Sequence, residues 1–282
     1  MNILKLLTAL CMVALLSACA STSSTRLQQV RQFAAESDTL SGYAELTTRF
    51  RDTYKREQPY LTAFAEHREK LIDAQRRAAY EDFLNIQKSV ALYMQTLGML
   101  AGDAEYDFRA QISALGSGIK AWPESGIEAR HVSAFTDLGR LIARMATLSS
   151  QERAVQGVLR EGEAPLQSLV DAMIRLTRYY DKTNANERKI VLGLFEVEIP
   201  FAAGPRDKLL ASLAKASYQS KAAEYGLIER RFALTEKYLN AIAQAHTSLL
   251  GHFDGLPVLA AAGDSANAGA PARLARLAPE AN

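Results

Sequence analysis

Side chains near the C-terminal end of the chain recur at alternating spacings of three and four residues. The members of this seam are Tyr218, Lys221, Tyr225, Ile228, Phe232, Thr235, Leu239, Ile242, His246, Leu249 and Phe253. Such spacing places every member on one face of an α-helix and is typical of the a and d positions of a coiled coil. A helix over residues 205–254 would be roughly 75 Å long, and its seam needs partners of similar length. We therefore predict an all-α fold, an elongated helical bundle with coiled-coil-like long helices.

Other stretches with helical spacing supply partners for this long helix. One stripe begins at Ser41, the expected N-cap, and ends near Gly98, and Pro59 is expected to bend it. Its apolar and aromatic members are Tyr43, Leu46, Phe50, Tyr54, Leu61, Phe64, Leu71, Ile72, Tyr80, Phe83, Val90, Met94 and Leu97. His67 falls on the same stripe. This stretch is the predicted packing partner of the seam.

Local signals predict further helices and breaks. Capping-box patterns at Ser125-x-x-Glu128 and Ser149-x-x-Glu152 predict two helix starts, and another helix is expected after Pro165. Weaker helices are expected near Arg26 and over residues 105–120. Residues 181–186 are expected to form a loop. Residues 194–201 alternate apolar and acidic side chains, which fits either a strand or the end of a helix followed by a crossover.

The first 19 residues indicate export. Lys5 is followed by an apolar run over residues 6–16, which is too short for a membrane-spanning helix and fits a secretory signal. Leu16-Ser17-Ala18-Cys19 resembles the lipobox, the site that bacterial lipoprotein signal peptidase recognises. The resemblance implies that residues 1–18 are removed and that Cys19 carries lipid on its sulfur and its amine. Ala20 follows in place of the Asp associated with inner-membrane retention. This implies a lipid anchor in the outer membrane that faces the periplasm, with display on the cell surface as the alternative.

Three further segments complete the expected organisation. Residues 19–37 are the lipidated N-terminus and tether, residues 38–255 are the helical bundle domain, and residues 256–282 are a disordered tail rich in Ala, Gly and Pro. Lys and Arg number 33 and Asp and Glu 31, giving a net charge of +2, so no nucleic-acid partner is expected. The expected partners are the membrane, through lipid on Cys19, and a protein.

Candidate catalytic and metal sites are few. Glu128 and His131 form an E-x-x-H pair, half of the pattern of di-iron carboxylate bundles, but no second copy exists among the four histidines. We therefore expect His131 to be a surface residue near a helix start and predict no metal site. His246 falls on the seam and is expected to be a polar core residue with a hydrogen-bond partner.

One short motif suggests carbohydrate chemistry. Pro123-Glu124-Ser125-Gly126 resembles the Glu-Ser start of the lytic transglycosylases, in which an acid protonates the glycosidic oxygen. The chain departs from that family downstream, where it reads Ala129-Arg-His-Val-Ser-Ala-Phe135 in place of Gly-Leu-Met-Gln. A phosphate loop and a dinucleotide fingerprint are also missing from the sequence. We therefore predict no catalytic residues and no cofactor.

Exposed aromatic and basic side chains are the remaining candidates for binding. Trp122 and Tyr179-Tyr180 are candidate anchors for a partner, although core burial is the more common fate of such residues. The pairs Arg76-Arg77 and Arg230-Arg231 have acidic neighbours and are expected to lie on solvated helix faces. The leading hypothesis is a non-enzymatic, lipid-anchored binding or scaffold protein of the envelope, for example an immunity protein against a secreted toxin. The alternative is an envelope enzyme acting on peptidoglycan or phospholipid.

Overall fold

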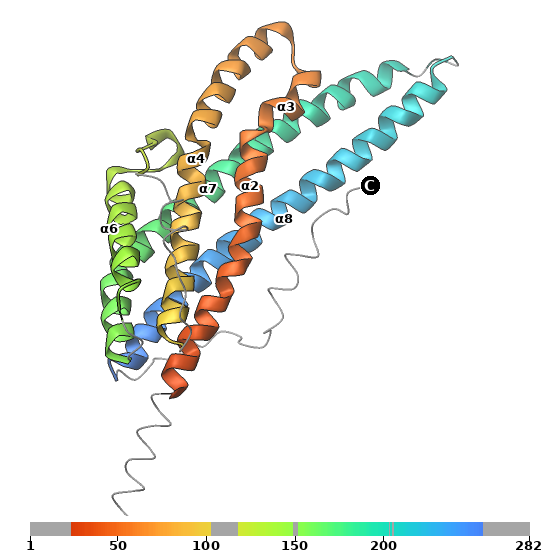
Figure 1. Cartoon of the computed structure of the whole chain (residues 1–282). Helices are drawn as coiled ribbons and strands as arrows, with labels where there is room; N and C mark the ends of the chain where they lie inside the picture. Colours follow the sequence, from red (N-terminus) through yellow and green to blue (C-terminus); the bar gives the residue numbers. More distant parts are fainter. Residues whose placement is uncertain (1–23, 103–117, 149–151, 203, 205, 256–282) are drawn as a thin grey trace, which may run out of the picture.

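The computed structural model describes residues 24–102, 118–148, 152–202, 204 and 206–255. These residues fold into helices that pack along one another, with no strand among them, which confirms the all-α prediction (Figure 1). The chain is helical over residues 24–35 and then forms η1 (Glu36–Leu40), α2 (Ser41–Arg51), α3 (Thr53–Glu57), η2 (Gln58–Tyr60), α4 (Ala63–Leu100), η3 (Pro123–Ser125), α6 (Ala129–Met145), α7 (Glu152–Glu198), η4 (Ile199–Ala202) and α8 (Lys208–Phe253).

Helices α7 and α8 form a long antiparallel hairpin. Each is about 70 Å long at ~1.5 Å per residue, and η4 lies at the far end of the hairpin from the first described residues (Figure 1). Every seam member from Tyr225 to Phe253 is buried, while Tyr218 and Lys221 are half-buried. The spacing of three and four residues therefore predicted the buried face correctly along most of α8.

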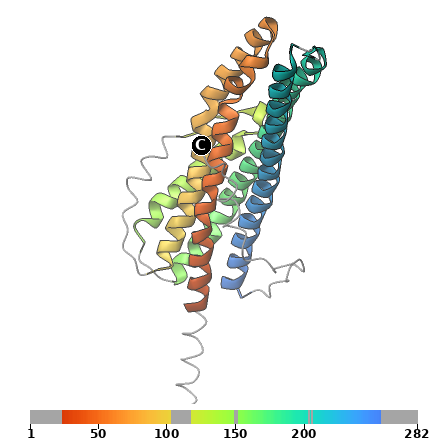
Figure 2. The ribbon, with the colours of Figure 1, turned by 90° about the vertical axis from the view of Figure 1, so that its right-hand side faces the viewer.

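The stripe that begins at Ser41 folds back on itself where a bent helix was expected. The chain turns at η2, which contains Pro59, and α4 then runs antiparallel to α2 (Figures 1 and 2). This arrangement buries Phe83, Val90 and Leu97 of α4, but Phe64 and Leu71 near its start are exposed. The packed body also takes in residues 24–35, because Val30 and Phe33 are buried in the core. A Cβ at Gly98 would collide with Ala34, so glycine lets this first helix approach α4 closely.

Helix α7 is continuous through two positions where breaks were expected. Pro165 lies inside it and is followed by buried Leu166, so the predicted helix start there is wrong. Residues 181–186 are helical, so the predicted loop is also wrong. Over residues 194–201 the helix continues to Glu198 and ends in η4, which excludes the strand interpretation. Burial of the apolar face of α7 against its neighbours, chiefly α8, α6 and α4, outweighs these local preferences.

Several sequence predictions lie outside the described residues. These are the signal peptide over residues 1–18, Cys19, most of the helix over residues 105–120, the capping serine at position 149 and the tail over residues 256–282. In the part of the chain that the structure describes, no helix is both long enough and apolar enough to span a bilayer.

Candidate functional site

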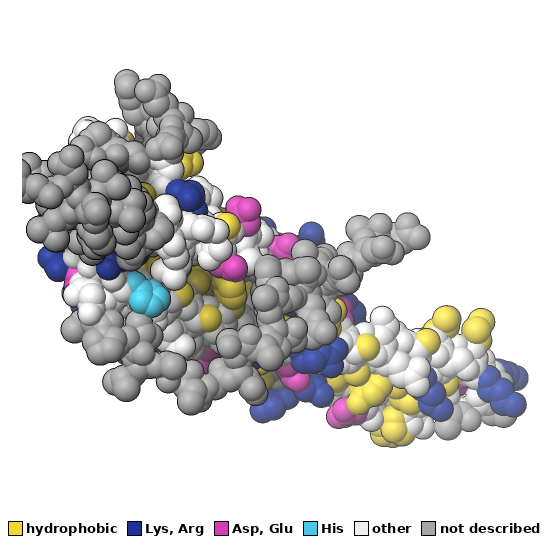
Figure 3. Space-filling view, turned by 90° about the horizontal axis from the view of Figure 1, so that it is seen from below, with side chains coloured by type: hydrophobic (Ala, Val, Ile, Leu, Met, Phe, Trp, Pro, Cys, Tyr) yellow, Lys and Arg dark blue, Asp and Glu magenta, His cyan; other side chains and the backbone are white. Residues whose placement is uncertain are grey.

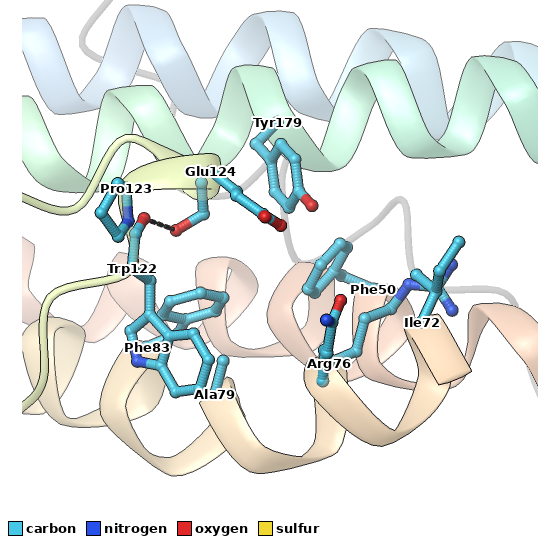
Figure 4. A pocket seen from close by; sticks show the side chains of 11 residues that line it. Phe50, Ile72, Arg76, Ala79, Phe83, Trp122, Pro123, Glu124 and Tyr179 are labelled. Atoms are coloured by element: carbon cyan, nitrogen blue, oxygen red, sulfur yellow. Dashed lines mark hydrogen bonds between the residues drawn. The ribbon is translucent and has the colours of Figure 1, made fainter. Parts of the chain in front are cut away.

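A pocket opens among α2, α4, α7 and the turn that contains η3. Its volume is about 220 Å³, and Figure 4 shows the side chains around it. The lining residues are Phe50, Ile72, Gln75, Arg76, Ala79, Phe83, Trp122, Pro123, Glu124, Ser125 and Tyr179. Because four elements contribute, the pocket exists only once the tertiary fold has formed.

The turn over residues 122–127 is held by hydrogen bonds that position Trp122. The Trp122 N–H donates to the Ile127 carbonyl at 2.8 Å and the Ile127 N–H donates back at 3.1 Å. The Ser125 hydroxyl donates to the Trp122 carbonyl at 2.8 Å (Figure 4). Gly126 adopts a φ of +87°, a left-handed conformation that closes the turn and favours glycine. The indole N–H then donates to Asp82 on α4 at 2.8 Å, which fixes the ring against the pocket.

Aromatic rings form most of the pocket wall. Phe83 and Trp122 meet edge to face with centroids 6.3 Å apart, and Phe50 lies 5.4 Å from Tyr179. Phe50 and Phe83 are buried, whereas Trp122 and Tyr179 are half-buried and present part of their surface to solvent. Burial raises the pKa of the Tyr179 hydroxyl, with a further contribution from Glu124 that Arg76 opposes. This hydroxyl therefore stays protonated at neutral pH.

Two charged residues of opposite sign complete the lining. Arg76 is only 7% exposed and contacts the face of Phe50, with its guanidinium carbon 5.8 Å from the ring centroid. Its Nη2 donates to Glu69, but its Nη1 has no hydrogen-bond partner among the described residues. Glu124 is exposed, and its side chain is directed toward Tyr179 (Figure 4). The pocket can therefore stack a flat or apolar group between rings and supply one buried donor.

Glu128 and His131 lie outside the pocket and cap the N-terminus of helix α6. His131 is fully buried, so the expected surface position is wrong. Its Nδ1 accepts the Glu128 backbone N–H at 2.9 Å, which makes Nε2 the protonated nitrogen facing Asp171 at 3.3 Å. Burial lowers the pKa of this imidazole. Helix α6 thus begins at Ala129 with Glu128 as its N-cap, one turn later than the predicted capping box at Ser125.

The other histidine prediction is confirmed. His246 is fully buried on the seam and has two hydrogen-bond partners, Tyr93 and Glu163. Over the described ranges, no group of three or more His, Cys, Asp and Glu side chains is placed to hold a metal ion.

Sequence reasoning placed some pocket residues correctly and missed others. Trp122, Glu124 and Tyr179 were singled out separately, and the structure brings them together. Arg76 and Arg231 were expected on solvated faces, but both are buried, and Arg231 pairs with Glu45. Arg77 and Arg230 are exposed, as predicted. A signal for Arg76 did exist, because Ile72, Arg76, Ala79 and Phe83 follow the same spacing of three and four residues as the α8 seam.

Comparison with models of protein families, with curated proteins and with solved structures finds no match to this chain.

Proposed function

We propose that this protein is a lipid-anchored lipoprotein of the outer membrane that faces the periplasm and acts as a non-enzymatic binding module. The sequence Leu16-Ser17-Ala18-Cys19 supports the anchor, through lipid on Cys19. The aromatic pocket supports the binding role. It receives a ring or an apolar group from a partner, which we expect to be a protein.

The observation that carries the binding role is the composition and shape of the pocket. Its half-buried aromatic rings, Trp122 and Tyr179, are the kind of side chain that contributes most to the energy of protein interfaces. Glu124 is the only carboxylate among the described residues that line the pocket. Glycoside hydrolysis ordinarily uses two carboxylates on either side of the scissile bond. This lining therefore favours binding over hydrolysis.

The chain provides its own reporter for this pocket. Trp122 is the only tryptophan in the sequence, so fluorescence excited selectively at tryptophan reports on the pocket wall. We expect a partner to change this emission with saturation. Tyr179→Ala should weaken the binding, while Lys237→Ala, on an exposed position of α8, should leave it unchanged.

The partner can be found in living cells by site-specific photocrosslinking. A photoreactive residue at Gln75, exposed at the pocket, should give one discrete adduct that the same residue at Lys237 does not give. The adduct should disappear in a Trp122→Ala background. An adduct that survives this substitution, or forms equally from both positions, would contradict binding at the pocket.

The anchor is tested separately. Cys19→Ser removes the acceptor of the thioether lipid, so it should abolish labelling by a clickable palmitate analogue and disturb the maturation or localisation of the protein. Undiminished labelling would overturn the lipoprotein assignment and leave the pocket unaffected.

A second candidate function is an envelope enzyme that acts on peptidoglycan or phospholipid. The observation in its favour is Glu124, a carboxylate exposed at an aromatic-walled pocket of a size that holds a sugar ring. A Glu124→Gln variant separates the two candidates, as argued in the Discussion.

A further inference from the structure

Arginine side chains lie over aromatic rings at four places among the described residues, and each of them also pairs with a carboxylate. The four sets are Arg26 with Phe253 and Glu152, Arg49 with Tyr225 and Glu224, Arg51 with Tyr80 and Asp52, and Arg76 with Phe50 and Glu69. Arg51 shows the geometry most clearly. Its guanidinium carbon lies 4.4 Å from the centre of the Tyr80 ring, while Nε and Nη2 donate to the two oxygens of Asp52 at 2.8 Å each. A ring beside a carboxylate therefore makes a site that suits a guanidinium.

The pocket offers rings and a carboxylate that no arginine of the described residues occupies. Tyr179 and Trp122 are half-buried, and no described arginine lies over either ring. Glu124 is exposed and directed toward Tyr179 (Figure 4), and it forms no hydrogen bond or ion pair with a described residue. The two half-buried rings and this unpaired carboxylate thus lie together at the outer part of the pocket.

The other charges close to the pocket are balanced. The ion pairs there are Arg76 with Glu69, Arg77 with Asp73, and Arg130 and Arg175 with Glu128 and Asp171. Further charges of opposite sign lie beside one another at Asp82 and Lys120, whose backbone N–H donates to Asp82 at 3.2 Å, and at the exposed neighbours Asp181 and Lys182. Among the described lining residues, Glu124 alone carries a charge without a partner, and a cation is the group that it attracts.

We propose that the pocket binds an arginine side chain of the partner protein, with its guanidinium stacked on Tyr179 or Trp122 and paired with Glu124. A guanidinium is flat, weakly hydrated and always charged, and its fork of donors matches the two oxygens of a carboxylate. Arg76 already covers Phe50, so the partner's guanidinium belongs at the two outer rings. The inference rests on the proposed binding role of the pocket and specifies the group that binds there.

Other ligand classes fit these groups less well. An anion would meet the unpaired carboxylate of Glu124 first, because Arg76 is only 7% exposed and is paired with Glu69. A lysine ammonium is a compact, strongly hydrated charge that neither stacks flat on a ring nor pairs through two parallel hydrogen bonds. An uncharged ring would fill the pocket but leave Glu124 unpaired. Arginine is the side chain that uses both the rings and the carboxylate.

Fluorescence titration with short peptides tests the proposal. The protein is the chain from residue 19 onward with Cys19→Ser, which keeps lipid out of the measurement, and Trp122 is the reporter. The probes are N-acetylated, C-amidated pentapeptides of glycine whose central residue is arginine, lysine, citrulline or phenylalanine. Citrulline has the shape of arginine without its charge. The arginine peptide should bind about threefold or more tightly than the lysine and citrulline peptides, and its affinity should fall as salt rises.

Substitutions assign this preference to residues of the pocket. Glu124→Gln removes the ion pair and should weaken binding of the arginine peptide about threefold. Glu124→Lys adds repulsion and should weaken it about tenfold, while a peptide with a central glutamate gains affinity. Tyr179→Ala should weaken binding, whereas Tyr179→Phe, which keeps the ring, should not. Glu81→Lys makes the same charge change at an exposed position of α4 outside the lining, and this matched control should bind like wild type.

A second control excludes binding to other apolar surface. The narrow end of the molecule shows apolar side chains beside charged ones (Figure 3). Phe201 and Leu209, at the end of the α7–α8 hairpin, are 81% and 73% exposed. Phe201→Ser with Leu209→Ser should therefore leave the Trp122 response to every peptide unchanged.

Equal affinities for the arginine and citrulline peptides would overturn the inference, as would an arginine affinity that Glu124→Lys leaves unchanged. A lack of binding by the arginine peptide would overturn it too. The proposed binding role is judged separately, by the photocrosslinked adduct and by the phenylalanine peptide. An adduct that depends on Trp122, found together with no preference for arginine, would retain the pocket as a binding site and reject only the guanidinium as its ligand.

Discussion

The imidazole of His246 on α8 donates from Nδ1 to the Glu163 carboxylate on α7 across 2.5 Å. Its Nε2 accepts from the Tyr93 hydroxyl on α4 at 2.8 Å, so one ring ties three helices together. Burial acts to raise the pKa of Glu163, but the hydrogen bonds from His246 and Thr247 outweigh it and hold this pKa below its ordinary value. His246 and Tyr93 are fully buried, and a Cβ at Gly162 would collide with the Tyr93 hydroxyl. A substrate has no access to this ring, so we assign it a structural role.

Tyr93→Phe tests that role. The substitution leaves His246 Nε2 buried without a donor, and an unsatisfied buried group costs about 1–3 kcal/mol of folding stability. Urea denaturation should show this loss. The control is Tyr54→Phe, whose hydroxyl donates to Glu66 in a less buried place and which should change the stability by less than about 0.5 kcal/mol. Equal effects of the two substitutions would contradict the structural role.

A buried carboxyl predicts a dependence of stability on pH. Burial, with the negative charges of Glu69 and Glu187, raises the pKa of Glu57 from 4.5 to about 8, against the opposing charge of Arg76. Between these values the folded protein holds a proton at Glu57 that the unfolded chain releases. The free energy of unfolding should therefore fall as the pH rises from about 5 to 8, by up to about 1.4 kcal/mol per unit.

The comparison of wild type with Glu57→Gln isolates this contribution. The variant should be less sensitive to pH over that range and more stable than wild type at pH 8. His131 acts in the opposite direction below its ordinary pKa of 6.5, because burial lowers its pKa, but this contribution is common to both proteins. Glu198→Gln, at an exposed position, is the matched control and should follow wild type. Parallel pH profiles for wild type and Glu57→Gln would refute the assignment.

The buried carboxylate of Glu187 is the centre of an ion-pair cluster. Arg56 lies 2.7 Å from it and Arg49 3.5 Å, and the Tyr225 hydroxyl donates to it at 2.9 Å. Glu187→Ala leaves two arginines without their buried partner and should cost about 3–5 kcal/mol. Glu229→Ala breaks an exposed pair with Arg188 and should cost less than about 1 kcal/mol in the same denaturation experiment. Similar losses would mean that burial of the pair is unimportant.

This cluster also contains features that the sequence did not predict. Residues 181–186 are so polar that they suggest a loop, yet they are helical, and Asn184 is buried and contacts Arg49. Asn184 and Glu187 point inward because their partners come from α2 and α3, far away in the sequence. Apolar periodicity predicted the α8 seam because water is excluded along that whole face. It could not predict pairings between distant charges.

The candidate site was predictable only in pieces. Trp122 and Tyr179 were candidates because aromatic side chains are common in interfaces. Glu124 was a candidate because it lies in the Pro123-Glu124-Ser125-Gly126 motif. Their convergence depends on the turn at η3 packing between α4 and α7, which no local pattern in the sequence encodes. Arg76 was predicted to be exposed because its neighbours are acidic. Its helical spacing from Phe83 was the better indication that it is buried.

Glu124→Gln separates binding from catalysis. If the pocket only binds, the variant should keep biological activity within a few-fold of wild type, because an exposed carboxylate contributes little to affinity. A loss of about a thousandfold or more, with unchanged circular dichroism, is the scale of a lost catalytic group and would establish the enzyme alternative. His131→Ala serves as the structural comparison. It should lower the melting temperature, because His131 accepts the Glu128 N–H, and should leave activity intact below that temperature.

The α8 seam offers the sharpest test of the architecture. Leu239 and Ile242 are buried there, and truncating a buried Leu or Ile to Ala typically costs 2–5 kcal/mol through lost transfer energy and the cavity left behind. A domain of this size has only about 5–15 kcal/mol of stability in total. Leu239→Ala with Ile242→Ala should therefore lower the melting temperature strongly or prevent soluble expression.

Lys237→Ala with Asn240→Ala, on the exposed face of the same turns, should change the stability by less than about 0.5 kcal/mol. Both pairs are best measured without residues 1–19, since an attached lipid would drive aggregation. Equal shifts would mean that the spacing does not report burial, and the packing of α8 on α7 would have to be revised.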